Sequence, residues 1–185
     1  MIIEHGREKL IDAIIYFLKK TKYCGKTKLF KLLYFLDFKH FRETGKAVTN
    51  LTYSTWPKGP VPVQLFEEIK NQPKDLTEHF EFETSECSSF LKITPKRKFD
   101  KKYFSKRELR LMERIAFIFK EAKSDDMIEA SHLPNHPWHK TKTNEGLYKE
   151  IDYLLAVDNT EGSLSLEEIK ERIKDKEEIM SAFNA

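Results

Sequence analysis

Three histidines lie close together in the chain, at His132, His136 and His139. Imidazole nitrogens are common ligands of zinc and other transition metals, so this grouping raises the question of a metal site. A helical histidine pair binds a metal only when one regular helix holds both rings on one face, and Pro134 and Pro137 interrupt such a helix. We therefore predict no metal site. One histidine is expected to bond backbone at a helix end, and the other two to be exposed.

A cysteine nucleophile is the second chemistry to consider. The two cysteines, Cys24 and Cys87, supply neither a disulfide framework nor a four-ligand zinc site. Cys24 lies between Lys22 and Lys26, whose positive charge would favour the thiolate, but its neighbours resemble no nucleophile motif. The glycines stand apart rather than forming a phosphate-binding loop. We predict structural, reduced thiols, no catalytic residue, no cofactor, and a protein that is not an enzyme.

The charge of the chain is small but unevenly distributed. The formal net charge is +3, with basic residues concentrated in segments 19–42 and 92–107 and acids in 67–86 and 161–178. Aromatic residues interleave with the basic ones, a pattern typical of proteins that bind single-stranded nucleic acid. An uneven charge equally steers association with an acidic protein surface. A nucleic-acid-binding regulator is therefore the alternative to a protein-binding module, and both are weighed against ordinary solvated helix faces.

Length and composition favour one globular domain. The 185 residues are 39% hydrophobic and 34% charged, which is an ordinary balance for a chain that can bury a continuous core. No apolar run approaches the length of a membrane span, and the charged first ten residues lack the apolar core of a signal peptide. We predict a cytoplasmic protein without a membrane partner. The oligomeric state stays open.

The elements that position these residues are predicted to be mainly helical. Segment 4–20 has an amphipathic helical period, whereas segment 26–44 is apolar around most of its circumference and is predicted to be the central helix, ending at Gly45. Alternation predicts a β-hairpin over 80–94. A short extended stretch followed by a rigid proline-containing loop is predicted over 47–62. Further helices are predicted over 63–70, 105–123, 124–132, 146–157 and 166–180, with capping boxes of Ser105 with Glu108 and Ser165 with Glu168 opening the second and the last.

The fold class is accordingly mainly α (α+β), a single-domain helical bundle around a central apolar helix. Residues 1–145 are predicted to form the helical domain with its small hairpin, and 146–185 a helical C-terminal extension packed on it or appended to it. The polar strip of the central helix holds Lys28, Lys31, Phe35, Lys39 and Arg42. Their helical spacing is expected to place four cations around one aromatic ring.

Three stretches, in this order, resemble one known family. Segment 28–38 has a lysine, a leucine pair and a tyrosine followed by an aromatic residue, like the signature helix of that family. Tyr53 and Trp56 run into Gly59-Pro60-Val61, which is similar to its Gly-Pro-Val turn. Ser131-His132 followed by Pro137-Trp138 is like its Ser-His and Pro-Trp element. Together they resemble the Panacea domain of SocA-like antitoxins, also described as phage-associated GepA-like proteins.

The resemblance implies a mainly helical domain without catalytic activity that neutralises a toxin encoded nearby by direct protein binding. It does not identify the toxin, and no family motif follows Trp138. A face made of the cationic strip and the turn at 56–61 is expected to form part of the contact, because basic side chains around aromatic anchors steer and hold acidic surfaces. The predicted partner-binding residues are Lys28, Lys31, Phe35, Lys39, Arg42, Trp56, Gly59, Pro60, Val61, His132 and Trp138.

Overall fold

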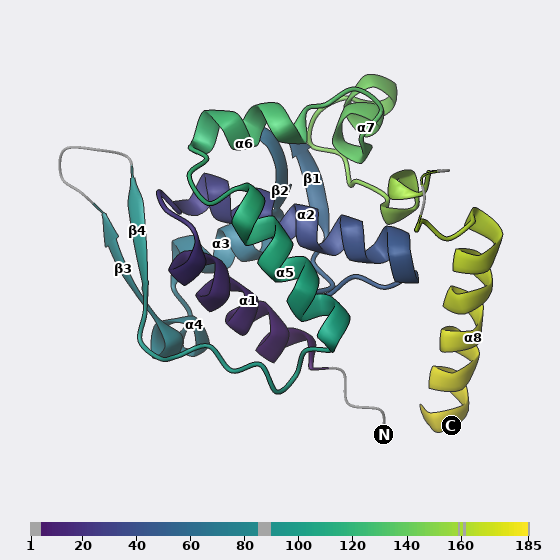
Figure 1. Ribbon diagram of the computed structural model, residues 1–185, viewed down its shortest axis with the longest axis horizontal. Coiled ribbons are helices and arrows are strands. Elements are labelled where there is room, and N and C mark those ends of the chain that lie inside the picture. The colour runs from purple at the N-terminus through teal and green to yellow at the C-terminus, as the bar shows by residue number, and fades with distance from the viewer. Residues whose placement is uncertain (1–4, 85–89, 159, 161, 185) are drawn as a thin grey trace.

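The computed structural model spans residues 1–185 and describes all of them except 1–4, 85–89, 159, 161 and 185. The central helix α2 is almost completely enclosed by the other elements (Figure 1). Cys87 lies outside the described residues. The helices are α1 (Gly6–Lys20), α2 (Lys26–Thr44), α3 (Val63–Asn71), α4 (Lys74–His79), α5 (Lys106–Ile118), α6 (Ser124–Ser131), α7 (Pro137–Glu145), the 3-10 helix η1 (Tyr153–Ala156) and α8 (Leu166–Asn184). The strands are β1 (Tyr53–Trp56), β2 (Gly59–Pro62), β3 (Phe80–Thr84) and β4 (Leu91–Pro95).

The prediction of α2 as the central helix is confirmed. Leu29, Leu32, Leu33 and Leu36 are fully buried, and α1, α5, α6, β2 and η1 all pack against this helix. Gly45 ends α2 in the left-handed conformation at φ 75°, which glycine adopts without the steric cost of a side chain. The mainly α fold with a small β component is therefore confirmed.

Two antiparallel hairpins carry the β component. β3 and β4 pair as predicted over 80–94. The prediction of a loop at 57–62 is wrong, because Gly59–Pro62 pairs with Tyr53–Trp56 as strand β2. Its prolines are tolerated because β2 is an edge strand that pairs with β1 on one side only among the described residues.

Two further segments differ from prediction. Pro137 begins helix α7 rather than only breaking a helix, since its missing N–H is not needed in the first helical turn. The α-helix predicted over 146–157 is absent. Instead the backbone of this stretch bonds to β1, with Ile151 N donating to Tyr53 O at 2.8 Å and Thr55 N donating to Lys149 O at 2.8 Å. A 3-10 turn, η1, follows.

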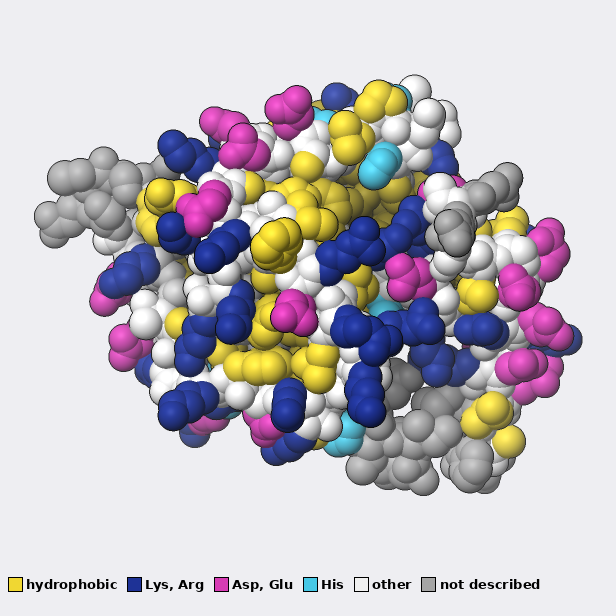
Figure 2. Space-filling model, viewed as in Figure 1, with side chains coloured by type: hydrophobic (Ala, Val, Ile, Leu, Met, Phe, Trp, Pro, Cys, Tyr) yellow, Lys and Arg dark blue, Asp and Glu magenta, His cyan; other side chains and the backbone are white. Residues whose placement is uncertain are grey.

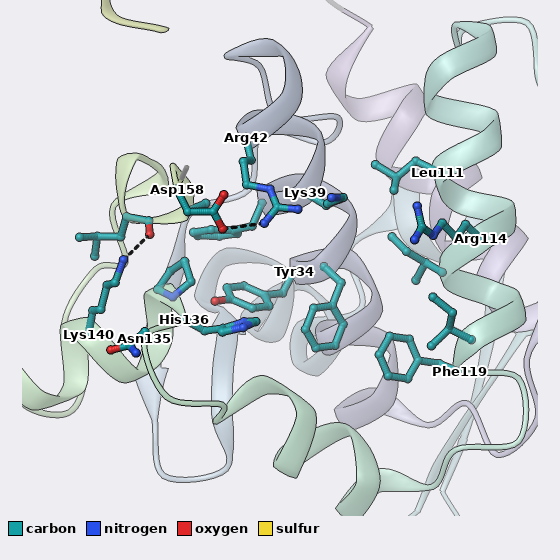
Figure 3. Close-up of a pocket in the computed structure, with 17 residues that line it drawn as sticks. Tyr34, Lys39, Arg42, Leu111, Arg114, Phe119, Asn135, His136, Lys140 and Asp158 are labelled. Carbon is teal, nitrogen blue, oxygen red and sulfur yellow. Dashed lines mark hydrogen bonds and ion pairs between the residues drawn. The ribbon is translucent and has the colours of Figure 1, made fainter. Parts of the chain in front are cut away.

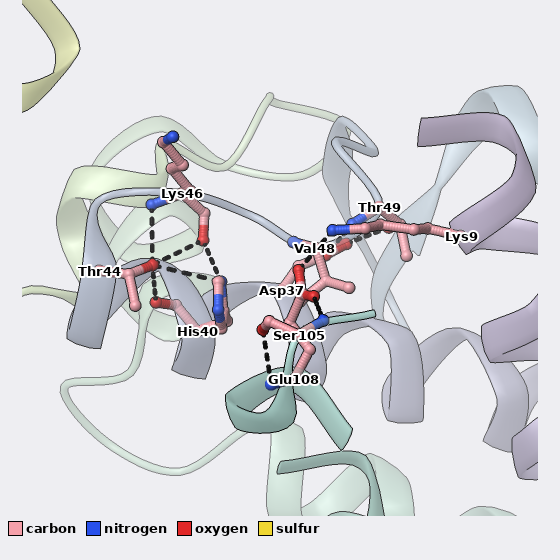
Figure 4. Close-up of polar contacts among 9 residues, drawn as sticks. All are labelled: Lys9, Asp37, His40, Thr44, Lys46, Val48, Thr49, Ser105 and Glu108. Carbon is pink, nitrogen blue, oxygen red and sulfur yellow. Dashed lines mark hydrogen bonds and ion pairs between the residues drawn. The ribbon is translucent and has the colours of Figure 1, made fainter. Parts of the chain in front are cut away.

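Buried polar groups fix the segment after α2 and the start of α5 (Figure 4). The Asp37 carboxylate accepts hydrogen bonds from the backbone N–H of Val48 (2.8 Å) and Thr49 (2.7 Å), which holds the chain between α2 and β1. Burial raises the pKa of Asp37 to about 6, although these bonds favour the charged form. Lys9 bonds Glu108 at 2.6 Å and so joins α1 to the first turn of α5.

Helix α8 lies beside the C-terminal end of α2 and projects away from the body (Figure 1). The buried Ile169 and the bond from Arg172 to Thr44 O (3.2 Å) attach it. The predicted capping box of Ser165 and Glu168 is confirmed by both reciprocal hydrogen bonds. The division at residue 145 stays a prediction. Within the described chain, every helix is too short or too polar to cross a bilayer.

Candidate partner-binding site

The first two family-like stretches meet the third inside the protein, at the turn before β2. Lys31 Nζ donates a hydrogen bond of 2.9 Å to Pro60 O. Gly59 has φ +96°, and a Cβ atom there would lie 2.5 Å from Ser131 Oγ and 2.7 Å from Lys31 Cε. Only a glycine fits this space without displacing its neighbours. The side chains of Lys31 from α2 and Ser131 from α6 therefore pack directly against the backbone of β2 at Gly59.

Trp138 makes the second junction. Its backbone N–H donates to the Tyr34 hydroxyl (3.3 Å), and its indole Nε1 donates to Trp56 O (3.3 Å). The His132 ring stacks on the indole with 3.7 Å between ring centroids. The side chain of Trp138 is only 2% exposed. We call Tyr34, Lys31, Gly59, Pro60, Ser131 and Trp138 the frame, because together they join α2, the β1–β2 hairpin, α6 and α7.

The prediction of an exposed strip is wrong at Lys28 and Lys31, which are 0% and 1% exposed. Lys28 Nζ donates to the carbonyls of Lys22 (2.7 Å) and Ala122 (2.6 Å), which follow the ends of α1 and α5. Carbonyl groups near helix ends lack intrahelical hydrogen-bond partners. A lysine that reaches them supplies donors to these carbonyls and finds acceptors for its own ammonium group. The ammonium groups of Lys28 and Lys31 both donate hydrogen bonds to carbonyl groups inside the protein.

The turn at 56–61 is also less exposed than predicted. Gly59, Pro60 and Val61 are buried, because β2 packs against α2 and α6. Trp56 is half-buried between Phe66 (ring centroids 4.9 Å apart) and Tyr148 (5.8 Å). A contact surface made of this turn is therefore not available as predicted.

Burial also changes the acidity of Lys31. Its pKa is lowered to about 7 from the usual 10.5, because the ammonium loses water and its described hydrogen bond is to a neutral carbonyl. The unfolded chain keeps this proton up to about pH 10, whereas the folded chain releases it near pH 7. The unfolded state binds more protons in between, so this group makes stability rise with pH across that window.

We expect Lys31→Met to remove this pH dependence. The wild type should gain up to about 1.4 kcal/mol of unfolding free energy per pH unit relative to the variant above pH 7, since methionine fills similar space and cannot titrate. Urea unfolding at several pH values measures the difference. Lys20→Met, at an exposed lysine of α1, is the control and should leave the slope unchanged. If the unfolding free energies of wild type and Lys31→Met change equally with pH, the lowered pKa of Lys31 is contradicted.

The remaining residues of the predicted strip line a pocket. Phe35, Lys39 and Arg42 face a cavity of about 280 Å³ bordered by α2, α5, the start of α7 and η1 (Figure 3). Its apolar lining comprises Tyr34, Phe35, Phe38, Leu111, Ile115, Ile118, Phe119, Pro137, Leu155 and Ala156. Phe35 and Phe119 stack in parallel, with centroids 5.0 Å apart and 9° between the ring planes. The strip therefore contributes one wall of a concave, largely apolar site.

The pocket carries an excess of positive charge. Its basic residues are Lys39, Arg42, Arg114 and Lys140, and its acid is Asp158. Arg42 binds Asp158 at 2.9 Å, but its Nε is buried without a hydrogen-bond partner in the described part of the chain. Arg114 is exposed and makes no hydrogen bond or ion pair with any described residue. The site can therefore attract and bind a negatively charged group.

The three histidines and Cys24 form neither a metal site nor a reactive thiolate among the described residues. His132 is half-buried against Trp138, and burial lowers its pKa. His136 is exposed at the pocket, as predicted for two of the three, but His139 is half-buried. Among the described residues, no group of three His, Cys, Asp or Glu side chains is placed to hold a metal ion. Burial raises the pKa of Cys24 to about 11, so the suggested thiolate does not form at neutral pH.

Many cations of the two basic segments are engaged within the protein. In 92–107, Arg97 binds both carboxylate oxygens of Asp12 (2.7 and 3.0 Å), and Lys92 pairs with Glu83 (2.8 Å). In 19–42, Lys28 and Lys31 are buried. Affinity for nucleic acid depends on how many free cations neutralise phosphates, so these contacts weaken the case for a nucleic-acid interface.

The local sequence patterns do not predict that residues of α5, α7 and η1 line the pocket. Arg114 and Ile118 share one face of α5 at a spacing of four residues, a signal that the amphipathic pattern does contain. That this face lies opposite Phe35 depends on how α5 packs against α2, which no local pattern specifies. Leu155 and Ala156 fall in the segment predicted, wrongly, as an α-helix.

Comparison with known proteins confirms the family that the three stretches resemble. The family model described as antitoxin SocA-like, Panacea domain, matches residues 29–139, which is more than half of the chain. Neither the curated proteins nor the solved structures contain a match to the chain. The matched range begins in α2, includes the whole frame and ends at the start of α7, so the chain belongs to the Panacea-domain family of SocA-like antitoxins.

Proposed function

We propose that this protein is the antitoxin of a toxin–antitoxin system and neutralises its toxin by binding it directly in the cytoplasm. The observation that carries the proposal is the family match over residues 29–139. We further propose that the protein has no catalytic activity and that the toxin is encoded beside it, as the resemblance to SocA-like antitoxins implies.

The arrangement of the matched residues supports a binding role. The frame residues make hydrogen bonds and packing contacts inside the protein, and these contacts hold four elements in fixed positions. A scaffold of this kind presents its surface with little loss of entropy on binding. Beside the frame lies an open pocket with an apolar lining and a cationic border. This combination suits recognition of another protein.

The test is co-expression with the neighbouring short reading frame. We expect that frame to stop growth when expressed alone and to be harmless when expressed with this chain. The two products should co-purify. The transcript level of the toxin should not change, since a nucleic-acid-binding regulator would lower it. The proposal is contradicted if no neighbouring product is toxic, or if toxicity persists when both proteins accumulate.

A titration separates binding from catalysis. In a cell-free assay of toxin activity, a direct binder should abolish activity at a stoichiometric ratio of antitoxin to toxin. An enzyme that modifies the toxin would act at far lower ratios and would leave the toxin inactive after separation. Activity should return when the complex is dissociated and the toxin is recovered.

A further inference from the structure

We propose that the pocket between α2, α5, α7 and η1 receives one large apolar side chain from an acidic segment of a partner protein. That the partner is the toxin rests on the proposed function, but the chemistry of the pocket does not. The apolar side chain would enter between Phe35, Phe119 and Tyr34, and neighbouring carboxylates would bind the cations at the border.

The size of the pocket favours a single side chain. Its volume of about 280 Å³ lies just below the usual range for small-molecule sites, about 300–1,000 Å³. Aromatic side chains supply the largest apolar contact for such a site and often dominate the energy of protein interfaces. The parallel pair of Phe35 and Phe119 offers a flat wall against which another ring can pack. An aromatic or long aliphatic anchor is therefore the fitting occupant.

The charges at the border favour an acidic segment. Lys39, Arg42, Arg114 and Lys140 surround the apolar lining, opposed within the pocket by Asp158. Figure 2 shows an apolar hollow on this face with Lys and Arg side chains beside it. Arg114 points from α5 toward the cavity, and Arg42 reaches it from α2 (Figure 3). A carboxylate beside the anchor would pair with the exposed guanidinium of Arg114, and the charge of Arg42, which already binds Asp158, adds to the attraction.

The apolar lining of the pocket reaches the protein surface at Ile118, near the end of α5. Ile118 lines the pocket and is 57% exposed. Its neighbour Phe117 is 81% exposed but is not part of the pocket lining. A pocket joined to exposed aliphatic surface is the usual form of a protein-contact site. The pair Ile118 and Phe117 also provides a matched comparison, because both are large, exposed and adjacent in one helix.

The frame makes the pocket rigid. Tyr34 and Pro137 both line the pocket, and the hydroxyl of Tyr34 accepts the backbone N–H of Trp138. Lys140 Nζ donates to Leu155 O at 3.1 Å, which joins α7 to η1 across one side. The site therefore exists before a partner arrives, and binding does not have to order it.

The first experiment measures binding of the purified neighbour-encoded toxin to variants of the full chain. Ile118→Ser and Arg114→Glu should each weaken affinity by at least about tenfold. Phe117→Ser and Lys101→Glu, which replace a large apolar and a basic side chain outside the pocket, should leave affinity within about threefold of the wild type. All four positions are exposed, so the fold should persist, and thermal unfolding verifies it. Equal affinity for pocket variants and controls would overturn the proposal while leaving the antitoxin function intact.

The second experiment does not require the toxin. The probe is the peptide acetyl-Glu-Asp-Trp-Asp-Glu-amide, and nuclear magnetic resonance follows the amide signals of the whole chain. We expect concentration-dependent shifts centred on α5 residues 114–119 and on Lys140. The shifts should vanish when the peptide tryptophan is alanine or the acids are lysine, and with the Arg114→Glu chain. Absence of shifts at millimolar peptide would overturn the proposal.

The toxin-binding and peptide-binding experiments distinguish failure of the proposed function from failure of the pocket assignment. If the neighbour is not toxic but the peptide binds in the pocket, the proposed function fails and the pocket assignment stands. If the toxin binds equally to Ile118→Ser and Phe117→Ser, the pocket assignment fails and the function stands. If the chain self-associates and Ile118→Ser abolishes that association, a second copy occupies the pocket and the acidic-segment proposal is overturned.

Discussion

Gly59→Ala is expected to lower the free energy of unfolding by about 2 to 5 kcal/mol. Two costs combine at this position. The backbone has φ +96°, which side-chain-bearing residues rarely adopt, and the new methyl group would lie 2.5 Å from Ser131 Oγ and 2.7 Å from Lys31 Cε. Ser131 and Lys31 are themselves buried, so neither can move into solvent to relieve the overlap. Chemical denaturation of both proteins measures the loss.

Gly146→Ala is the matched control. Gly146 has φ +97°, but a Cβ atom there meets nothing within 4 Å. Its backbone, at φ 97° and ψ −164°, lies in a region essentially restricted to glycine, so this variant should show the backbone cost alone, about 1 to 3 kcal/mol. Adding Ser131→Ala to Gly59→Ala should recover part of the loss, because it removes the nearest atom. Equal destabilisation by Gly59→Ala and Gly146→Ala would show that the close approach of α2, β2 and α6 does not matter.

The elements predicted correctly are those whose signals are local. The capping boxes at Ser105 and Ser165 mark helix starts through contacts three residues apart. Gly45 marks a helix end through its own backbone angle. The β3–β4 hairpin follows from alternation in two neighbouring runs. The interactions that form each of these features join residues close together in the chain, so the local sequence is sufficient to predict them.

The elements predicted wrongly depend on distant partners. Residues 146–157 have a helical apolar pattern, but β1, more than 90 residues earlier, offers unpaired backbone groups that take up their N–H and C=O groups. The position of Pro137 predicts a break in a helix, although the same residue is favourable in a first helical turn. Local patterns do not decide between these outcomes.

The candidate site shows the same division. Phe35, Lys39 and Arg42 share one face of α2, as the helical spacing predicts, and all three line the pocket. Lys28 follows the same spacing but is buried, because its ammonium reaches carbonyls of Lys22 and Ala122, the second 94 residues away. Spacing places a residue on a face, whereas only packing determines whether that face meets solvent.

Trp138→Ala is expected to be the most damaging single truncation of the frame, with a loss of about 3 to 5 kcal/mol in unfolding free energy. The indole is 2% exposed, stacks on His132 at 3.7 Å and donates to Trp56 O at 3.3 Å. Alanine would leave a cavity between α6 and α7 and would remove the indole donor to Trp56 O at the end of β1. Chemical denaturation of wild type and variant provides the measurement.

Trp138→Phe and Trp56→Ala are the comparisons that assign this loss. Phenylalanine keeps a ring against His132 but loses the indole N–H, so about 1 to 2 kcal/mol should be lost. Trp56 is half-buried, and its truncation should cost less than that of Trp138. The indole fixes the start of α7, where Pro137 lines the pocket and the backbone N–H of residue 138 bonds the Tyr34 hydroxyl, so Trp138→Ala should also weaken acidic-peptide binding under conditions where the chain is still folded. Unchanged binding in that variant would mean that the frame stabilises the fold without shaping the pocket, and equal losses for both tryptophans would contradict the central position of Trp138.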